Sequence, residues 1–327
     1  MYGKCMKKKQ KYKIGWVGFH QEGMDAFNGI LEVGYKVDAV FTLDEESAQL
    51  RSGSISYDEM CEAHDIPLYK INNINDSNVI AILKKLDLDI LFVIGRSQII
   101  KKEAMACIKV GIIGAHASLL PHNRGSAPVN WAIINGEKVT GNSLIWLTEE
   151  VDEGDIIAQQ EIDITLYDTC KSIYRKVAAS NRDMILEFLN KSEQEIPPST
   201  KQKNIDEPLL PRRRPQDGCI DWNQPATKIY DFIRAITHPY PGGFSYINGK
   251  KMLIWEVALL VDVIVPGCKP GQVIGAVYSP NACACGFLVA CQRGVINILH
   301  MEDEMGNDYK GQALAELDYK DLEFLNE

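Results

Sequence analysis

Two residues in the stretch 111–157 have types and positions that could support acid–base chemistry at an amine. His116 directly follows an apolar run, so we expect it at the carboxyl end of a buried strand. Asp152 comes later, in a predicted loop between two apolar segments, from which it could return to the same edge of the sheet. An amine that attacks a carbonyl loses a proton, and a histidine can take part in that transfer while a carboxylate orients its ring. Because an isolated His and Asp are more often structural, the pair indicates catalysis only together with the residues around it.

The chain between these two residues is predicted to turn sharply and then form a helix. Residues 118–121 (SLLP) turn the chain after the strand, and the Arg-Gly pair at 124–125 continues the loop. Pro128 is well placed to open a helix over 129–134, since proline is favoured at the first helical position.

Other motifs for cofactor chemistry are weak. Gly15, Gly18 and Gly23 do not fit the spacing of the dinucleotide-binding fingerprint, and the sequence contains no P-loop motif. The nine cysteines are scattered, apart from Cys283 and Cys285. A closed zinc site needs four ligands at recognisable spacing. We therefore expect reduced or buried thiols and no metal site.

The elements that must position these residues follow from the apolar pattern. Up to residue 165, short apolar runs alternate with helical patterns, which predicts a mostly parallel sheet covered by helices on both faces. Such sheets bind ligands beyond the carboxyl ends of their strands, here after the first strand, after Gly95 and after Ala115. Residues 44–56 are expected to be a polar loop that does not pack. The expected strands are 13–19, 37–43, 68–71, 88–95 and 111–115, and the expected helices are 24–31, 58–64, 76–86, 103–108, 129–134 and 169–190.

The composition changes after the last of these helices. Residues 192–217 are rich in proline and charge, which indicates a linker that runs over the surface. Beyond a helix over 227–237, Asn248-Gly249 is a hairpin signal. The expected strands there are 244–247, 252–257, 272–278, 287–291 and 295–301. Short strands joined by turns predict a small OB-like β-barrel.

The charge and hydropathy exclude some classes of function. The formal net charge is −9, which argues against a protein that tracks the phosphates of nucleic acids. No apolar run approaches the ~18 to 20 residues of a membrane span. The basic N-terminus leads into no signal-peptide core. We therefore expect a cytoplasmic protein with no membrane partner.

The residues around the histidine and aspartate form a long motif. Its positions are His116, Ser118, Leu119, Leu120, Pro121, Arg124, Gly125, Pro128, Trp131, Gly136, Gly141, Asp152, Gly154, Asp155 and Ile156. This motif resembles the N10-formyltetrahydrofolate-dependent formyltransferase family, which includes methionyl-tRNA formyltransferases and sugar N-formyltransferases. Residues 233–246 look most like the formyltransferase domain of the bifunctional lipid A aminoarabinose enzyme.

The resemblance implies an α/β fold with a Rossmann-like formyltransferase domain and a smaller OB-like domain. The implied boundaries are an N-terminal extension at 1–11, the catalytic domain at 12–191, a linker at 192–217, the OB-like domain at 218–310 and a tail at 311–327.

The resemblance also implies the reaction and its residues. The formyl group of N10-formyltetrahydrofolate, the co-substrate, would pass directly to a primary amine, with His116 and Asp152 as catalytic groups and no metal. The implied folate contacts are Arg96, Ser97, Gln98, Ile99, Ser118, Leu119, Leu120, Pro121, Glu149 and Val151. The implied acceptor contacts are Arg124, Gly125 and Pro128.

One position departs from the family pattern Asn-x-His. Gly114 stands where the family has an asparagine that helps to hold the formyl oxygen as it becomes an oxyanion. Losing one such donor costs about 10²- to 10³-fold in rate. Ser97, Gln98 or Asn142 could substitute, or a backbone N–H or a water could serve. Alternatively, the chain could bind folate or sugar without catalysis, or hydrolyse the formyl-folate.

The acceptor is expected to be a nucleotide-linked amino sugar, with methionyl-tRNA as the alternative. The tRNA enzymes of the family carry a basic insertion after the second strand, whereas residues 44–57 here include three consecutive acids and one arginine, Arg51. This segment could instead form a lid over the sugar. The basic runs 212–214 and 250–251 favour the tRNA alternative. Exposed hairpins of the β domain could support a homodimer.

Overall fold

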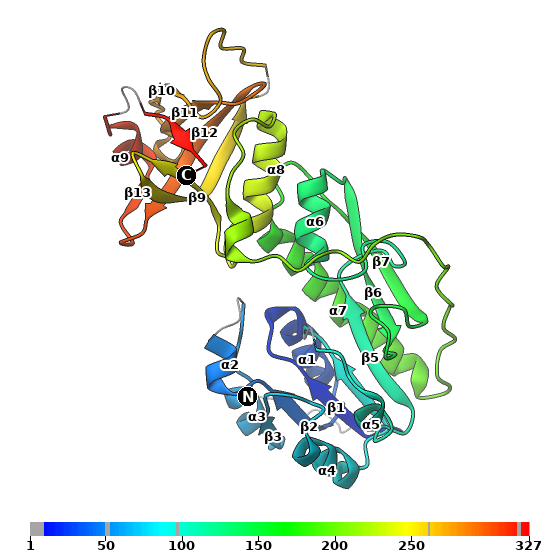
Figure 1. Cartoon of the computed structure of the whole chain (residues 1–327). Coiled ribbons are helices and arrows are strands. Elements are labelled where there is room, and N and C mark those ends of the chain that lie inside the picture. Colours follow the sequence, from blue (N-terminus) through cyan, green and yellow to red (C-terminus); the bar gives the residue numbers. More distant parts are fainter. Residues whose placement is uncertain (1–9, 50–52, 96–97, 261, 319–321, 327) are drawn as a thin grey trace. The chain divides into compact units, whose positions relative to one another are not determined.

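The computed structural model describes residues 10–49, 53–95, 98–260, 262–318 and 322–326, which form two compact units (Figure 1). The N-terminal unit contains residues 1–128, 139–163 and 173–211, and the C-terminal unit contains residues 129–138, 164–172 and 212–327. The C-terminal unit therefore includes two short segments that precede residue 173. The boundaries expected from the sequence placed both segments in the catalytic domain.

The N-terminal unit is built on a seven-stranded sheet in the order β3-β2-β1-β4-β5-β6-β7. Its strands are β1 (Ile14–Val17), β2 (Val37–Thr42), β3 (Leu68–Lys70), β4 (Ile90–Val93), β5 (Gly111–His116), β6 (Val139–Trp146) and β7 (Ile156–Asp163). Strands β1 to β5 pair in parallel, whereas β6 and β7 pair antiparallel. The predicted mostly parallel sheet is confirmed. The strand order reverses between β1 and β4, and open α/β sheets bind ligands at such a switch.

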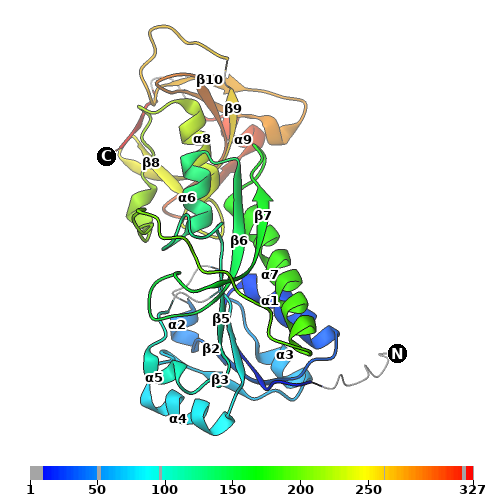
Figure 2. The ribbon, with the colours of Figure 1, turned by 90° about the vertical axis from the view of Figure 1, so that its right-hand side faces the viewer.

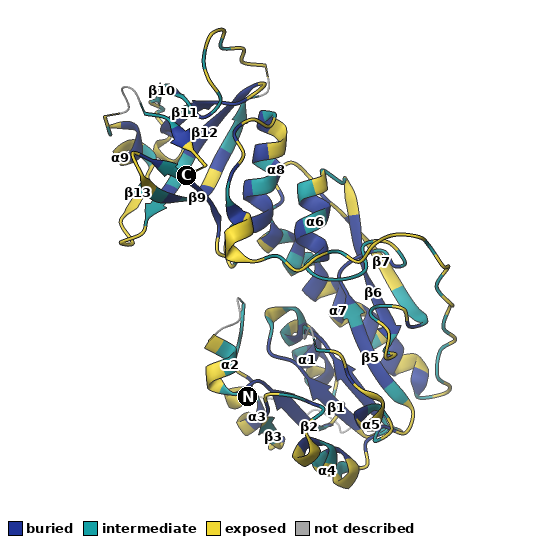
Figure 3. Ribbon diagram, viewed as in Figure 1, coloured by how far each residue is buried: buried dark blue, intermediate teal, exposed yellow. Residues whose placement is uncertain are grey.

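Helices cover both faces of this sheet. They are α1 (Gln21–Glu32), α3 (Asp58–Ala63), α4 (Ser77–Leu86), α5 (Lys102–Met105) and α7 (Cys170–Ser192). Helices α1, α3 and α7 pack on one face around Trp16 and Phe188, and α4 and α5 pack on the other face around Phe41 and Leu83. Figures 1 and 2 show α7 running along β6. Strands β1 and β2 are dark in Figure 3 because apolar side chains are buried on both of their faces.

The expected polar loop after β2 contains more structure than predicted. A short helix, α2 (Glu45–Gln49), follows Asp44, whose carboxylate accepts a hydrogen bond from the Ser47 amide at 2.8 Å. Ser54 forms an isolated β-bridge with His20. The prediction of a loop was wrong for residues 45–49, where a side-chain cap starts a helix. No residue of α2 is buried, in line with the expected lack of packing, whereas Ile55 packs against the core.

The C-terminal unit is an antiparallel sheet in the order β10-β11-β12-β9-β8-β14, with β13 beside β12. Its strands are β8 (Gly243–Ile247), β9 (Lys250–Leu260), β10 (Val273–Val277), β11 (Gly286–Ala290), β12 (Val295–Asp303), β13 (Asp308–Lys310) and β14 (Phe324–Leu325). Its helical elements are α6 (Pro128–Asn135), α8 (Ala226–Ile236), α9 (Gly311–Ala315) and the 3₁₀ turns η1 (Pro215–Gly218) and η2 (Ala282–Ala284). The pairing of β9 with β12 is irregular near His300, and such irregularities bend a sheet. The predicted OB-like β domain is confirmed as a curled antiparallel sheet.

The two early segments of this unit pack on α8. Asn130 donates from Nδ2 to the Ala235 carbonyl at 2.6 Å. Arg234 is buried, lies 2.7 Å from the Asp231 carboxylate and donates to the Thr165 carbonyl at 3.0 Å. Buried polar groups with these partners tie the two segments to the C-terminal unit.

The residues after 310, which the sequence suggested as a tail, are part of the C-terminal sheet. Strand β14 pairs with β8, and Phe324 lies in the core. Across the described ranges, no helix is both long and apolar enough to cross a membrane.

Candidate active site

His116 is the last residue of β5, at the carboxyl end of the parallel strands. Its cross-strand neighbour is Ser143. Both side chains lie on the face opposite α7, because the next residue on β6, Leu144, lies in the core under α7. The His116 side chain is 9% exposed, with Nδ1 3.4 Å from Asp152 Oδ2 and Nε2 2.8 Å from the Asn123 carbonyl oxygen. The structure thus brings together the two residues that the sequence suggested and adds the Asn123 carbonyl.

Asp152 presents its carboxylate from a strained backbone. Its φ of +56° lies in the left-handed region, which costs a residue with a side chain roughly 1–2 kcal/mol. Its Oδ2 accepts a hydrogen bond from the Gly125 amide at 2.9 Å. Two residues later, a Cβ on Gly154 would lie 1.6 Å from the Trp146 carbonyl oxygen. The motif glycine therefore allows the chain to turn tightly after the aspartate.

The loop after His116 is held by side chains from β6 and β7. The Ser143 hydroxyl donates to the Ser118 carbonyl at 2.6 Å and accepts from the Leu120 amide at 3.2 Å. Gln159 donates from Nε2 to the Leu120 carbonyl and to the Ser143 hydroxyl, each at 2.8 Å. Because Ser118 and Leu120 are buried in this network, they support the loop from within.

Gly114 adjoins a space that is already filled. A Cβ on Gly114 would lie 2.5 Å from Leu147 Cδ2 and 3.0 Å from its Cγ, so Leu147 occupies the direction in which an asparagine would extend. Asn142 points to the opposite face, where its Nδ2 donates to Ser180 Oγ at 2.7 Å and to Asn181 Oδ1 at 2.6 Å. This fully buried network removes Asn142 from the residues that could replace the family asparagine.

We expect Gly114→Asn to lower both the melting temperature and the turnover. The new side chain would overlap Leu147, and overpacking costs typically about 1–3 kcal/mol. In the double variant Gly114→Asn/Leu147→Ala, the melting temperature should recover and turnover should exceed that of Leu147→Ala alone. Thermal denaturation and initial-rate assays on the three variants check this. A single variant as stable as the parent would show that Leu147 moves aside freely.

The expected folate loop after β4 is described in part. Arg96 and Ser97 lie outside the described residues. Gln98 Oε1 accepts a hydrogen bond from the Ile74 amide at 3.1 Å. Ile99 is 59% exposed. The described part of the loop is therefore anchored to the segment before α4 and presents Ile99 to solvent.

The other expected folate residues lie on two loops. Glu149 Oε1 accepts from the Lys102 amide at 3.2 Å, which ties its loop to α5. Leu119, Pro121 and Val151 are each partly exposed. These three could contact a ligand directly, in contrast to the buried Ser118 and Leu120.

Two of the three expected acceptor residues, Arg124 and Gly125, are hydrogen-bonded within the protein. The Arg124 side chain is 13% exposed, donates from Nε and Nη2 to Gln202 Oε1 at 3.3 and 2.9 Å, and places Nη1 3.2 Å from Glu153 Oε1. Gly125 donates its amide to the candidate carboxylate. Pro128 begins α6, as predicted. The Arg124 guanidinium therefore links two loops within the protein.

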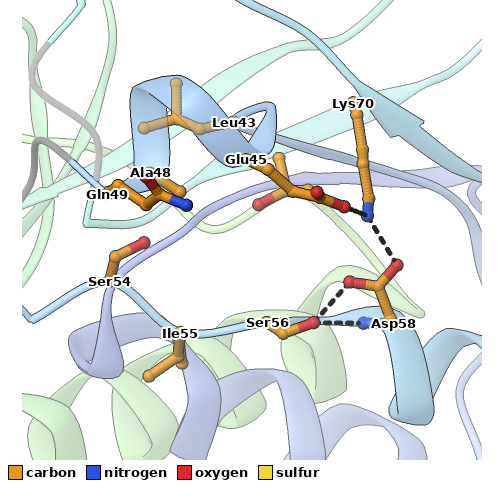
Figure 4. Close-up of a pocket in the computed structure, with 10 residues that line it drawn as sticks. Leu43, Glu45, Ala48, Gln49, Ser54, Ile55, Ser56, Asp58 and Lys70 are labelled. Atoms are coloured by element: carbon orange, nitrogen blue, oxygen red, sulfur yellow. Dashed lines mark hydrogen bonds and ion pairs between the residues drawn. The ribbon is translucent and has the colours of Figure 1, made fainter.

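A pocket of about 290 Å³ lies beside β2 and α2, in the segment that the sequence suggested as a lid (Figure 4). Lys70 Nζ lies 3.1 Å from Glu45 and 3.0 Å from Asp58. A hydrogen bond from Ser56 and the contact with Lys70 hold the pKa of Asp58 below its ordinary value. The Lys70 ammonium is already neutralised by two carboxylates, so it is not available to pair with a phosphate. The pocket instead offers hydroxyl groups, such as that of Ser54, to a ligand.

Some residues of the site were not evident from the sequence. Strand alternation could have identified Ser143, which shares a face with His116. Asn123 acts through its carbonyl, and its φ of +58°, where asparagine is enriched, is a weak signal. Gln202 lies in the segment read as a linker, where no periodic pattern marks it. In the part of the chain that the structure covers, no group of three or more His, Cys, Asp or Glu could hold a metal ion.

Comparisons with known proteins bear on what this site does. The family model of the formyl transferases matches residues 28–189, and that of the formyl transferase C-terminal domain matches residues 213–317. The bifunctional polymyxin resistance protein ArnA of Wigglesworthia glossinidia brevipalpis is 37% identical over 294 residues, which cover 88% of this chain and 42% of ArnA. The chain thus spans less than half the length of this relative.

Two known structures share the fold. HypX from Aquifex aeolicus in complex with tetrahydrofolic acid has a TM-score of 0.62 and 19% identity, over 92% of this chain and 46% of HypX. The N-formyltransferase from Helicobacter canadensis in complex with folinic acid and dTDP-3-aminofucose has a TM-score of 0.63 and 18% identity, over 88% of this chain and 99% of that chain. At these identities the similarity shows the fold alone.

Proposed function

This chain belongs to the formyl transferase family, and we propose that it transfers a formyl group from N10-formyltetrahydrofolate to a primary amine on a nucleotide-linked amino sugar. The observation that carries the proposal is the His116–Asp152 pair, whose Nδ1 and Oδ2 atoms lie 3.4 Å apart at the carboxyl end of β5. An imidazole beside a carboxylate at this edge suits an amine that must lose a proton as it attacks.

The proposed reaction makes one bond and breaks another at the formyl carbon. The amine nitrogen bonds to this carbon, and the bond between the carbon and folate N10 breaks. The amine loses one proton and N10 gains one, so the net reaction neither consumes nor releases protons. The chain's part is to carry that proton and to stabilise the oxyanion that forms between the two events.

Asp152 and His116 divide these tasks. Asp152 Oδ2 faces His116 and the Gly125 amide, which leaves the other carboxylate oxygen to accept the amine proton through a water. His116 Nε2 faces the Asn123 carbonyl, and in the proposed step its N–H turns to the oxyanion. The 3.4 Å separation of the pair is long for a hydrogen bond, and catalytic contacts often tighten only when substrate binds. With glycine at 114, we assign oxyanion support to His116, with a backbone N–H or a water beside it.

Two observations support an amino sugar over tRNA as the acceptor. The N-formyltransferase from Helicobacter canadensis, which shares this fold, was seen with dTDP-3-aminofucose, an amino-sugar nucleotide. The pocket segment after β2 presents paired carboxylates where a phosphate-rich tRNA would need cations. Methionyl-tRNA remains the second candidate acceptor because of the basic run 212–214.

A binding and turnover screen tests the proposed function. Thermal shift with folinic acid reports folate binding, and turnover is then measured with N10-formyltetrahydrofolate and a panel of nucleotide-linked amino sugars. Matched sugars with a hydroxyl in place of the amine serve as controls. We expect a folate-dependent shift and formylation of at least one amino sugar, with no product from its hydroxyl counterpart.

Three other outcomes would contradict the proposal in different ways. Turnover with methionyl-tRNA alone would assign the alternative acceptor. Formate release without any acceptor would indicate a formyl-folate hydrolase. Folate binding without turnover or hydrolysis would indicate a non-catalytic binder.

A further inference from the structure

The segment 200–210, here called the strap, was expected to be a surface linker, but it is bonded to both loops of the candidate site. It contains no helix or regular strand. Near its start, Thr200 and Ile156 exchange two backbone hydrogen bonds, both of 2.8 Å. At its end, Leu210 donates to the Arg124 carbonyl at 2.7 Å and accepts from the Ser126 amide at 2.9 Å. The strap therefore joins the loop after β5 to the loop before β7.

Gln202 makes the contact with the strained aspartate. Its Nε2 donates to the carbonyls of Asp152 and Gly154, each at 2.7 Å. Its Oε1 accepts two hydrogen bonds from Arg124, whose third nitrogen pairs with Glu153. Both ends of the Gln202 amide are thus used, and its orientation is fixed by a guanidinium that is itself largely buried.

These contacts hold Asp152 from both sides. A residue in the left-handed region persists only where its surroundings enforce it, and the Gln202 amide bonds the carbonyl of that residue. On the side-chain face, the carboxylate accepts from Gly125 N–H. Gly125 lies against the strap, since a Cβ there would come 2.6 Å from the Leu210 backbone. The strap thus fixes the backbone that carries the carboxylate and the donor that orients it.

We propose that Gln202 is a positioning residue for formyl transfer, an inference that rests on the function proposed above. Gln202 holds the Asp152 backbone in the conformation that aims its carboxylate at His116, and Arg124 holds Gln202. Arg124 acts here within the protein, not as a contact to the acceptor. Since a displacement of about 1 Å can cost about 10²-fold in rate, a distant amide can control turnover.

Kinetics of two Gln202 variants test the proposal. Gln202→Met keeps the volume and removes all four hydrogen bonds, and Gln202→Glu keeps the acceptor for Arg124 but loses the donors to the two carbonyls. We expect each variant to lower kcat by about 10- to 100-fold while KM for folate and for the amine stays unchanged. Lys203→Ala, an exposed neighbour on the strap, is the matched control and should keep the parental kcat.

Hydrogen–deuterium exchange supplies a readout that does not depend on turnover. The amides of residues 152–156 should exchange faster in Gln202→Met than in the parent. In Lys203→Ala, the exchange rates of the same amides should equal those of the parent. Parental kcat or parental exchange in Gln202→Met would overturn the inference. The inference would also be overturned if Gln202→Met raised KM at unchanged kcat, or if Lys203→Ala lost as much kcat as Gln202→Met. If the parent formylates no acceptor, the proposed function fails, and the exchange measurement still decides whether Gln202 holds Asp152.

Discussion

Replacing His116 with alanine is expected to lower kcat for formyl transfer by about 10²- to 10³-fold, the usual cost of losing one donor to an oxyanion. The variant removes the N–H that would support the oxyanion. It also leaves Asp152 without its partner at 3.4 Å. Initial rates with formyl-folate and the acceptor identified in the screen measure the effect, and circular dichroism checks the fold.

Two further measurements separate the role of His116 from a loss of packing. Added imidazole should restore part of the rate, because it can occupy the space that the deleted ring leaves beside Asp152. His64→Ala, at an exposed position after α3, is a control that should keep the parental rate. A His116→Ala enzyme with an intact spectrum and near-parental kcat would contradict the assignment.

The Asp152→Asn variant is expected to lower kcat by about 10²- to 10⁴-fold with little change in melting temperature. Asparagine is enriched at positive φ, so it fits the +56° backbone of Asp152. Its side-chain oxygen can still accept from the Gly125 amide, and its carbonyl can still accept from Gln202. The variant therefore removes the charge beside His116 and keeps the local structure. Parallel measurement of kcat and melting temperature tests this.

Asp152→Ala provides the comparison that isolates backbone strain. Alanine at positive φ cannot be stabilised by a side-chain hydrogen bond. We therefore expect Asp152→Ala to be less stable to unfolding than Asp152→Asn by about 1 kcal/mol, which should appear as a lower melting temperature. Both variants should lose similar amounts of kcat. If only Asp152→Ala were slow, the carboxylate would have a structural role and the proton-accepting role would be wrong.

The amino-acid sequence determined the elements that carry the site. Apolar runs predicted the parallel strands β1, β2, β4 and β5, because a strand buried on both faces must be apolar on both. The same rule placed His116 at a carboxyl edge, since the polar residue ends the run. The short strands and turns after residue 243 predicted the second, β-rich unit. These features depend on local patterns, which a single sequence displays directly.

Packing between distant segments decided how the site is completed. The 3.4 Å approach of Asp152 to His116, the filled space beside Gly114 and the inward direction of Asn142 each depend on which segments meet in space. No periodic pattern in the sequence predicts which distant segments come into contact. The same holds for Gln202, whose segment reads as a solvated linker because its backbone hydrogen bonds are made to distant loops and need no apolar side chains. The local pattern of apolar and polar residues predicts which parts of the chain are buried. The geometry of this site depends instead on hydrogen bonds between distant segments, which form only after the chain has folded.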